Sequence, residues 1–374
     1  MRASERRQAI ERELELTGRV DVASLARALL VSPVSIRRDL NDLVDRGQAR
    51  RVYGGAVAIK QSPIRPSRPR PVPARRQGAV IGLVVPSSRY YYLSVLQGVK
   101  EAAAPRQARV ALAVSGYSIE QEQAQIARLL ERGVAALVIT PAVVPERDAG
   151  TYELLAGLDV PVVLMERDGG DAFSRLDSVR SDHEFGARLA FQRLFDLGHR
   201  SVALVCAQRT ATAGWLHSGL ESRRTLFGPD GAEVMDIPSA PEYAPELLQR
   251  IDDVLDRFVE RGVTGALVHS DVAAGVLAQR ALERDTPQLR DLHVIAYDDE
   301  IAALADPPLD AIAPPKHEVG RLALELALER AQSGAGGDEA VPRHVALSPV
   351  LVTRSGIGSG QDDDEMAPDP EDHA

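Results

Sequence analysis

From residue 79 onward the chain alternates apolar runs of strand length with longer amphipathic stretches, and this alternation constrains its fold most. The runs are almost continuously apolar, which is typical of parallel strands that helices cover on both faces. We therefore expect an α/β region with two doubly wound parallel sheets and ligands at the carboxyl ends of the strands. The runs are AVIGLVVP, VALAVSG, AALVITP, PVVLMER, SVALVCA, GALVHSD and HVIAYDD.

The charge of the chain is divided unevenly along its length. Residues 1–76 carry 17 lysines and arginines against 8 acidic residues, a net charge of +9. Residues 77–374 carry a net charge of −19, which gives the whole chain its net charge of −10. A basic segment before an acidic body indicates nucleic-acid binding confined to one end. The length of 374 residues predicts two or three domains.

Several function classes are disfavoured by what the sequence lacks. The start, MRASERRQAIERE, is charged, and no apolar run approaches the ~20 residues of a membrane span. The single cysteine, Cys206, excludes an intrachain disulfide and indicates a reducing compartment, so we expect a cytoplasmic protein. Because G-x-S-x-G, H-E-x-x-H, C-x-x-C and P-loop motifs are absent, we expect no enzyme activity, metal site or cofactor.

The clearest helix of the basic segment spans residues 32–46. Ser32 can cap it, Pro33 suits the first helical position, and Gly47 ends it. Helical spacing predicts a packing face with Ile36, Leu40, Leu43 and Val44, and an opposite face with Val34, Ser35, Arg38 and Asn41. Arginine can bind guanine edges and asparagine adenine edges in a major groove. The alternative is an amphipathic helix whose polar face is only solvated.

The sequence segments on either side of this helix support its interpretation as a DNA-binding helix. Two shorter helices precede it, and β-branched residues around Gly54 and Gly55 predict a small hairpin. The stretch VSPVSIRRDLNDLVDRGQARRVYGGA resembles the DeoR-type winged helix-turn-helix, and the resemblance covers residues 1–60. It implies DNA contacts by Ser32, Ser35, Arg37, Arg38 and Asn41 on the helix, and by Arg50, Arg51 and Tyr53 on the hairpin. Arg37 lies at the flank of the helix, where a phosphate contact is the alternative.

Two segments have a composition that is not typical of folded domains, one between the two domains and one at the end of the sequence. Residues 61–77 have proline at every second to third position and five arginines, which predicts an extended basic linker. It serves either as a spacer or as an additional phosphate contact. Residues 357–374 form a tail with seven acidic and no basic residues after position 360, which predicts disorder.

Residues 78–356 resemble the sensor domain of LacI-type regulators, which has the fold of periplasmic binding proteins. The resemblance implies two lobes joined by three crossings, with a small effector between them. Lobe one would comprise about residues 79–172 and 305–332, and lobe two about 173–304 and 340–356. The words that carry it are IGLVVP, LLERGVAALVITP, PVVLMERDGG, VRSDHEFGARLAFQRLFDLGHRSVALV, GALVHSDVAAGVLAQRAL, VIAYDDE, PPLDAIAPPKHEVGRLALELAL and SPVLVTRSG.

Candidate effector residues are those that follow strands and can pair with hydroxyl groups or stack on a sugar ring. The resemblance supports six of them, whereas Trp215 is inferred from the residues alone. Helix capping is the alternative role for Asp182 and Asp271. The complete set is Arg89, Tyr91, Tyr92, Arg167, Asp182, Trp215 and Asp271.

The sequence departs from sugar-binding relatives at several polar positions. Leu216 stands where an arginine is usual, His183 where an asparagine is usual, and Pro314-Pro315 where a Gln-Pro pair is common. A buried hydroxyl without its partner costs about 1–3 kcal/mol, so we expect an effector other than a hexose or purine, or a degenerate pocket. The proline-rich linker cannot supply the hinge helix of LacI-type proteins, which predicts signalling through dimer geometry.

Together these features predict a cytoplasmic, homodimeric transcription regulator that acts as a repressor. Its head would bind a double-stranded DNA operator, and a carbohydrate or related metabolite would control it. Two other function classes stay open. One is a solute-binding protein without a DNA role, and the other is a sugar-phosphate-processing enzyme, because many DeoR-type heads are fused to such a domain.

Overall fold

The computed structural model describes residues 10, 19–22, 25–26, 31–32, 35–36, 38–40, 43, 49–52, 55–58, 78–207, 210–239, 244–284, 286–333 and 341–354. The chain divides into two compact units, Met1–Ala74 and Arg75–Ala374, which are described separately. Within the described ranges, no helix is both long and apolar enough to cross a membrane.

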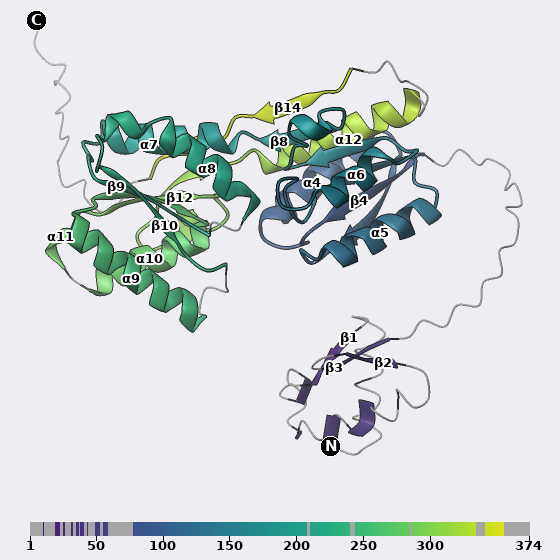
Figure 1. Cartoon of the computed structure of the whole chain (residues 1–374), viewed down its shortest axis with the longest axis horizontal. Coiled ribbons are helices and arrows are strands. Elements are labelled where there is room, and N and C mark those ends of the chain that lie inside the picture. The colour runs from purple at the N-terminus through teal and green to yellow at the C-terminus, as the bar shows by residue number, and fades with distance from the viewer. Residues whose placement is uncertain are drawn as a thin grey trace, which may run out of the picture. The chain divides into compact units, whose positions relative to one another are not determined.

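The first unit contains a small antiparallel sheet of three strands, drawn in purple in Figure 1. Strands β2 (Ala49–Val52) and β3 (Gly55–Ala58) form the predicted hairpin, and β1 (Arg19–Asp21) pairs with β3. Strand β1 was not expected, because three residues are too few to show a period. A separate apolar cluster comprises Ile10, Val22, Ala26, Ile36, Leu40 and Leu43.

Lobe one of the second unit has a sheet of six parallel strands in the order β14-β8-β7-β6-β4-β5. Its helices are α4 (Tyr91–Ala103), α5 (Ile119–Glu131), α6 (Ala149–Ala156) and α12 (Lys316–Ser333). Its strands are β4 (Val80–Val85), β5 (Arg109–Val114), β6 (Ala136–Ile139), β7 (Val162–Met165), β8 (Asp177–Ser181) and β14 (His344–Leu347).

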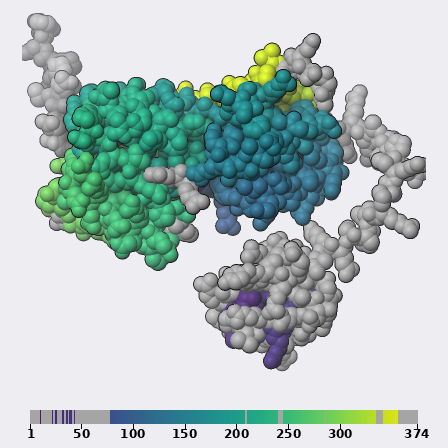
Figure 2. Space-filling view, viewed as in Figure 1, coloured from purple at the N-terminus to yellow at the C-terminus, as the bar shows by residue number. Residues whose placement is uncertain are grey.

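Lobe two has the sheet order β10-β9-β11-β12-β13-β15, in which only β15 runs antiparallel to its neighbour among the described strands. Its strands are β9 (Val202–Cys206), β10 (Ala232–Asp236), β11 (Gly265–His269), β12 (His293–Tyr297), β13 (Asp310–Ala313) and β15 (Val350–Val352). Its helices are α7 (His183–Asp196), α8 (Ala211–Glu221), α9 (Pro245–Arg261), α10 (Asp271–Glu283) and α11 (Pro287–Arg290). Figures 1 and 2 show the two lobes side by side.

The predicted α/β class with two largely parallel sheets is confirmed, and all seven apolar runs contain strands. The lobe boundaries differ from those expected. Strands β8 and β14 belong to the sheet of lobe one, and β13 belongs to lobe two, so the chain passes between the sheets three times. An apolar run predicts a strand but does not say which sheet the strand joins, because its neighbours decide that.

Helix α12 follows lobe two in sequence but packs against α4 of lobe one. Two glycines permit this close crossing. A Cβ on Gly98 would lie 1.9 Å from the carbonyl oxygen of His317, and one on Gly320 would lie 2.1 Å from that of Val95. The tight packing fixes the start of α12, and therefore Lys316, beside the space between the lobes.

Candidate functional site

A cleft of about 490 Å³ lies between the lobes, a size within the usual range for small-molecule sites. Its lining residues lie near or beyond the carboxyl ends of strands in both sheets, as the fold class predicts. Lobe one supplies Tyr90, Tyr91, Tyr92, Tyr117, Ala142, Glu166 and Arg167. Lobe two supplies His183, Thr210, Ala211, Thr212, Ser239, His269, Ser270 and Asp298.

Backbone strain concentrates around this cleft. Five described residues other than glycine have a positive φ, and four of them line it. These are Tyr90 at 50°, Tyr117 at 60°, Glu166 at 54° and Asp298 at 80°, whereas Gln107 lies elsewhere. Such conformations cost energy and persist where surrounding structure enforces them, commonly at ligand sites. The strain therefore supports a functional cleft.

Glu166 is the most completely bonded carboxylate of the cleft. Its Oε1 accepts hydrogen bonds from the Tyr91 hydroxyl at 2.6 Å and the Ser181 hydroxyl at 3.0 Å. Its Oε2 accepts the Ser181 N–H at 3.0 Å and lies 3.5 Å from His183 Nε2. Burial acts to raise the pKa of Glu166, but these partners outweigh it and lower that pKa to about 2. Glu166 is therefore an ionised structural anchor.

Arg167 follows Glu166 but is much less well paired. Only 7% of the residue is exposed. Its Nη1 donates to the Glu166 carbonyl oxygen at 2.6 Å, whereas its Nε has no hydrogen-bond partner among the described residues. A buried guanidinium is costly unless its charge and donors are matched, so this side chain is suited to a ligand.

On the opposite wall, Asp271 also accepts hydrogen bonds at both of its carboxylate oxygens. Its Oδ2 accepts the N–H groups of Glu300 at 2.8 Å and Ile301 at 2.7 Å, and its Oδ1 accepts the hydroxyl of Tyr90. Tyr90 belongs to lobe one, so this last bond joins the lobes across the cleft. Burial, with Asp298 and Asp271 nearby, raises the pKa of Tyr90 well above its usual value, so its hydroxyl keeps its proton.

A charged group closes the other end of the wall. Asp298 is 3% exposed, and its Oδ1 has no hydrogen-bond partner among the described residues. Lys316 Nζ lies 3.7 Å from that oxygen but donates instead to Glu300 Oε1 at 2.8 Å. The ammonium group also lies 4.9 Å from the ring centroid of Tyr91. Asp298 Oδ1 is therefore a buried acceptor atom that forms an ion pair with Lys316 but accepts no hydrogen bond from the described residues.

The structure places the candidate effector residues in three kinds of position. Tyr91, Tyr92 and Arg167 line the cleft. Asp271 lies in its wall, where it bonds Tyr90 and the backbone of residues 300 and 301; the cap position of α10 belongs to Ser270.

The other three candidates lie outside the lining. Arg89 has an exposed side chain. Asp182 takes the alternative role, because its Oδ1 caps α7 by accepting the Phe185 N–H at 3.0 Å. Trp215 stacks on the ring of the lining residue His183, with ring centroids 5.4 Å apart, but does not itself line the cleft.

Sequence reasoning missed six lining residues that carry a phenol, imidazole or carboxylate group. The signal that would have found several of them is their position directly after a strand, as with Asp298 after HVIAY and Glu166 after VVLM. Of the sequence departures, Leu216 lies fully buried in the core of lobe two, and His183 is buried beside Glu166. The six are Tyr90, Tyr117, Glu166, His183, His269 and Asp298.

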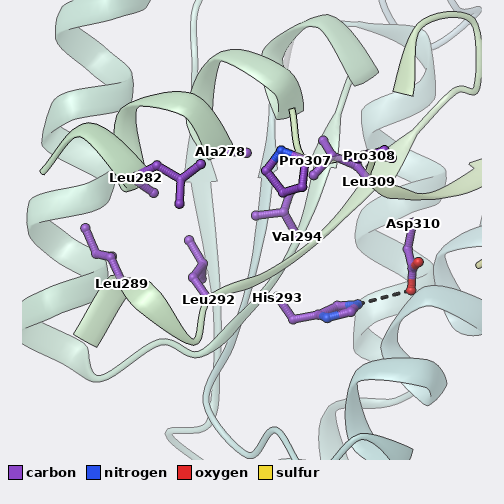
Figure 3. Close-up of a pocket in the computed structure, with 11 residues that line it drawn as sticks. Ala278, Leu282, Leu289, Leu292, His293, Val294, Pro307, Pro308, Leu309 and Asp310 are labelled. Atoms are coloured by element: carbon purple, nitrogen blue, oxygen red, sulfur yellow. Dashed lines mark hydrogen bonds and ion pairs between the residues drawn. The ribbon is translucent and has the colours of Figure 1, made fainter. Parts of the chain in front are cut away.

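A second, smaller crevice lies in lobe two at α10 and α11 (Figure 3). It measures about 20 Å³ and its lining is mostly apolar, including Leu282, Leu289 and Leu292. The two polar residues at its edge bond each other, because His293 Nε2 lies 3.2 Å from Asp310 Oδ2. It therefore lacks both the volume and the free polar groups that a metabolite requires.

In the first unit, the described part of residues 32–46 has the expected arrangement. Ser32 caps the helix, because its hydroxyl accepts the Ser35 N–H at 3.2 Å. Ile36, Leu40 and Leu43 are buried, and Arg38 is exposed. Arg37, Asn41 and Tyr53 lie outside the described residues, and for Arg50 and Arg51 only the backbone, in β2, is described.

Comparisons with protein families divide the chain in the same way. Residues 6–62 match the DeoR-like helix-turn-helix domain. Residues 78–219 match the periplasmic binding proteins and sugar binding domain of the LacI family, and residues 191–357 match a periplasmic binding protein-like domain. Consecutive matches thus cover most of the chain, and the two resemblances found in the sequence are confirmed.

Individual relatives are regulators. The chain is 24% identical to the HTH-type transcriptional repressor PurR of Aliivibrio fischeri over 91% of its own length and 98% of the relative's. It is 25% identical to the ribose operon repressor of Haemophilus influenzae over 76% of its own length and 82% of the relative's. Among solved structures, the Lac repressor bound to ONPG has a TM-score of 0.61 at 22% identity, covering 75% of this chain and 82% of that one. That likeness concerns the fold.

Proposed function

Because the chain joins a DeoR-like helix-turn-helix domain to the periplasmic-binding-protein-like domain of the LacI family, we propose that it is a metabolite-controlled transcriptional repressor. The head would bind operator DNA, and the cleft would bind the effector. The observation that carries the proposal is this combination, because a solute-binding protein has no use for a DNA-binding head. The relatives are named as regulators, which favours the same function over an enzyme.

The capped helix of the head has the chemistry for DNA recognition. Its buried face holds Ile36, Leu40 and Leu43, and this leaves Arg38 exposed for a base edge in the major groove. Arg50 and Arg51 of the hairpin would bind phosphate, which positions the head without reading sequence. A homodimer would place two such heads on the half-sites of one operator.

The cleft supplies the sensor. A ligand bound between two lobes changes their equilibrium only through contacts that differ between open and closed arrangements. The Tyr90–Asp271 bond is such a contact, since it exists only while the lobes are close. We propose that a cytoplasmic metabolite shifts this equilibrium and thereby changes the affinity of the dimer for DNA.

The proposal is tested by selecting bound fragments from genomic DNA with the purified full-length protein and measuring their affinities by fluorescence anisotropy. We expect enrichment of a repeated or palindromic sequence. Arg38→Ala should cost about 1–3 kcal/mol on that sequence and relax its base preference, whereas Arg50→Ala should weaken all DNA equally. Arg132→Ala, on the exposed surface of the second unit, is the matched control and should change neither. Failure to enrich any sequence contradicts the proposal.

A further inference from the structure

A buried histidine contacts both lobes at one of the points where the chain passes between them. Strand β8 of lobe one ends at Ser181, and α7 of lobe two begins at His183. His183 Nε2 lies 3.5 Å from Glu166 Oε2 in lobe one, and its Nδ1 lies 2.8 Å from the hydroxyl of Tyr297 in lobe two. Because the chain crosses here, a change in the arrangement of the lobes changes the surroundings of His183.

The two partners of His183 suit its imidazole ring in either protonation state. An ionised carboxylate only accepts hydrogen bonds, so Glu166 can accept from Nε2–H in both states. Tyr297 keeps its proton, because burial, followed by nearby carboxylates, raises its pKa well above the usual value. Its hydroxyl can donate to a bare Nδ1 or accept from Nδ1–H. His183 can therefore gain or lose a proton without leaving a ring nitrogen unpaired.

Only one member of the His183–Glu166 pair changes its charge near neutral pH. Burial acts to raise the pKa of Glu166, but its hydrogen bonds and His183 lower it to about 2, so the carboxylate stays ionised. Imidazole groups change charge between about pH 5 and 8. A proton gained by His183 therefore creates an ion pair between the lobes in a buried region, where charges are weakly screened.

The groups around His183 come from several elements. Trp215 of α8 stacks on its ring, and Arg180 of β8 lies over the indole, 5.0 Å from the ring centroid. His269 follows β11; burial lowers its pKa and the charge of His183 lowers it further, whereas Asp298 opposes both, so His269 adds little repulsion. The remaining groups are each occupied by another partner, and they are Tyr91, Asp168, Asp182, Glu184 and Lys316.

We propose that His183 makes the closure of the cleft respond to pH, because its protonated form holds lobe two to Glu166 of lobe one and its neutral form releases it. The link is strongest at low pH and is lost as the pH rises. The asparagine that is usual at this position could bond the same partners but could not carry a charge. Only the effect on DNA rests on the proposed function, since the response of the lobes does not require DNA.

Fluorescence of the full-length protein tests the titration directly. Trp215 is the only tryptophan of the chain and stacks on His183, and a cationic imidazole quenches an indole more strongly than a neutral one. We expect the emission to fall as the pH is lowered from 8 to 5.5. His183→Asn should remove this transition, and His183→Gln repeats the test if the first variant does not fold. His217→Asn, which alters an exposed histidine of the same helix, should leave it unchanged.

Small-angle X-ray scattering of the same samples measures the lobes. The radius of gyration of the parent should be larger at pH 8 than at pH 5.5, and His183→Asn should lose this difference. Glu122→Gln, which removes another buried group that titrates near neutral pH, should keep it. A constant radius in the parent, an equal pH dependence in His183→Asn, no fluorescence transition, or a transition that survives in His183→Asn overturns the proposal.

Operator affinity at the two pH values separates this inference from the proposed function. All eight histidines lie at or after position 183, so none belongs to the head. We expect the affinity of the parent to depend on pH and His183→Asn to reduce that dependence. Absence of operator binding, with the fluorescence and scattering responses retained, would overturn the proposed function alone.

Discussion

The two walls of the cleft use their charged residues in parallel ways. Each wall has one saturated carboxylate, Glu166 in lobe one and Asp271 in lobe two. Each also has one incompletely bonded group, Arg167 and Asp298 respectively. All four residues are at least 90% buried, so burial does not separate them. The two kinds of residue therefore differ in the number of hydrogen-bonding atoms without a partner and not in burial.

The largest expected effect that would break this comparison is on stability. Glu166→Gln should lower the free energy of unfolding by about 3 kcal/mol, because it removes the charge from a buried carboxylate next to His183 and its hydroxyl donors. Asp298→Asn should cost less, about 1–2 kcal/mol, because Lys316 keeps its hydrogen bond to Glu300 when the ion pair with Asp298 is lost, and one oxygen of Asp298 has no hydrogen bond to lose. Urea denaturation of both variants measures this difference, and equal losses would contradict the division into fully bonded anchors and incompletely bonded residues.

An intermediate effect separates contacts across the cleft from contacts within one wall. Tyr90→Phe removes a hydroxyl that bonds Asp271 across the lobes, whereas Tyr91→Phe removes one that bonds Glu166 inside lobe one. Each should cost about 1–2 kcal/mol of stability. Only Tyr90→Phe should also increase the radius of gyration in small-angle X-ray scattering, because the lobes then open more often. An equal increase in both variants would show that the Tyr90–Asp271 hydrogen bond does not hold the lobes together.

The smallest effect concerns Glu122, whose pKa burial raises to about 7. The folded protein therefore holds a proton that the unfolded chain releases near pH 4.5, so the stability from this group is present below pH 4.5 and is lost as the pH rises through 7. The neutral variant Glu122→Gln should gain in unfolding temperature relative to the parent at pH 8 but not at pH 4.5. A gain that is the same at both values would mean that Glu122 does not titrate in this range.

The sequence allowed more of the fold than of the cleft to be predicted. The seven apolar runs contain strands, and the Ser32 cap was expected, because both depend on neighbouring residues. Strand β8, with the polar sequence DSVRS, was not recognised, because its burial is set by β7 and β14 on either side. Asp182 and Asp298 both follow strands, yet one caps a helix and the other lines the cleft. Which of the two roles a residue takes depends on its position relative to the other lobe, and the local sequence does not indicate that position.

The central claim is that the basic N-terminal domain binds DNA. The salt dependence of DNA affinity tests this claim most directly. The dissociation constant of the full-length protein for its selected operator would be measured by fluorescence anisotropy between 50 and 200 mM salt. Each neutralised phosphate contributes about −0.9 to the slope of log affinity against log salt, so several contacts should weaken binding ~100-fold or more over this range. A dissociation constant that does not change with salt, or no measurable binding at low salt, would contradict the account.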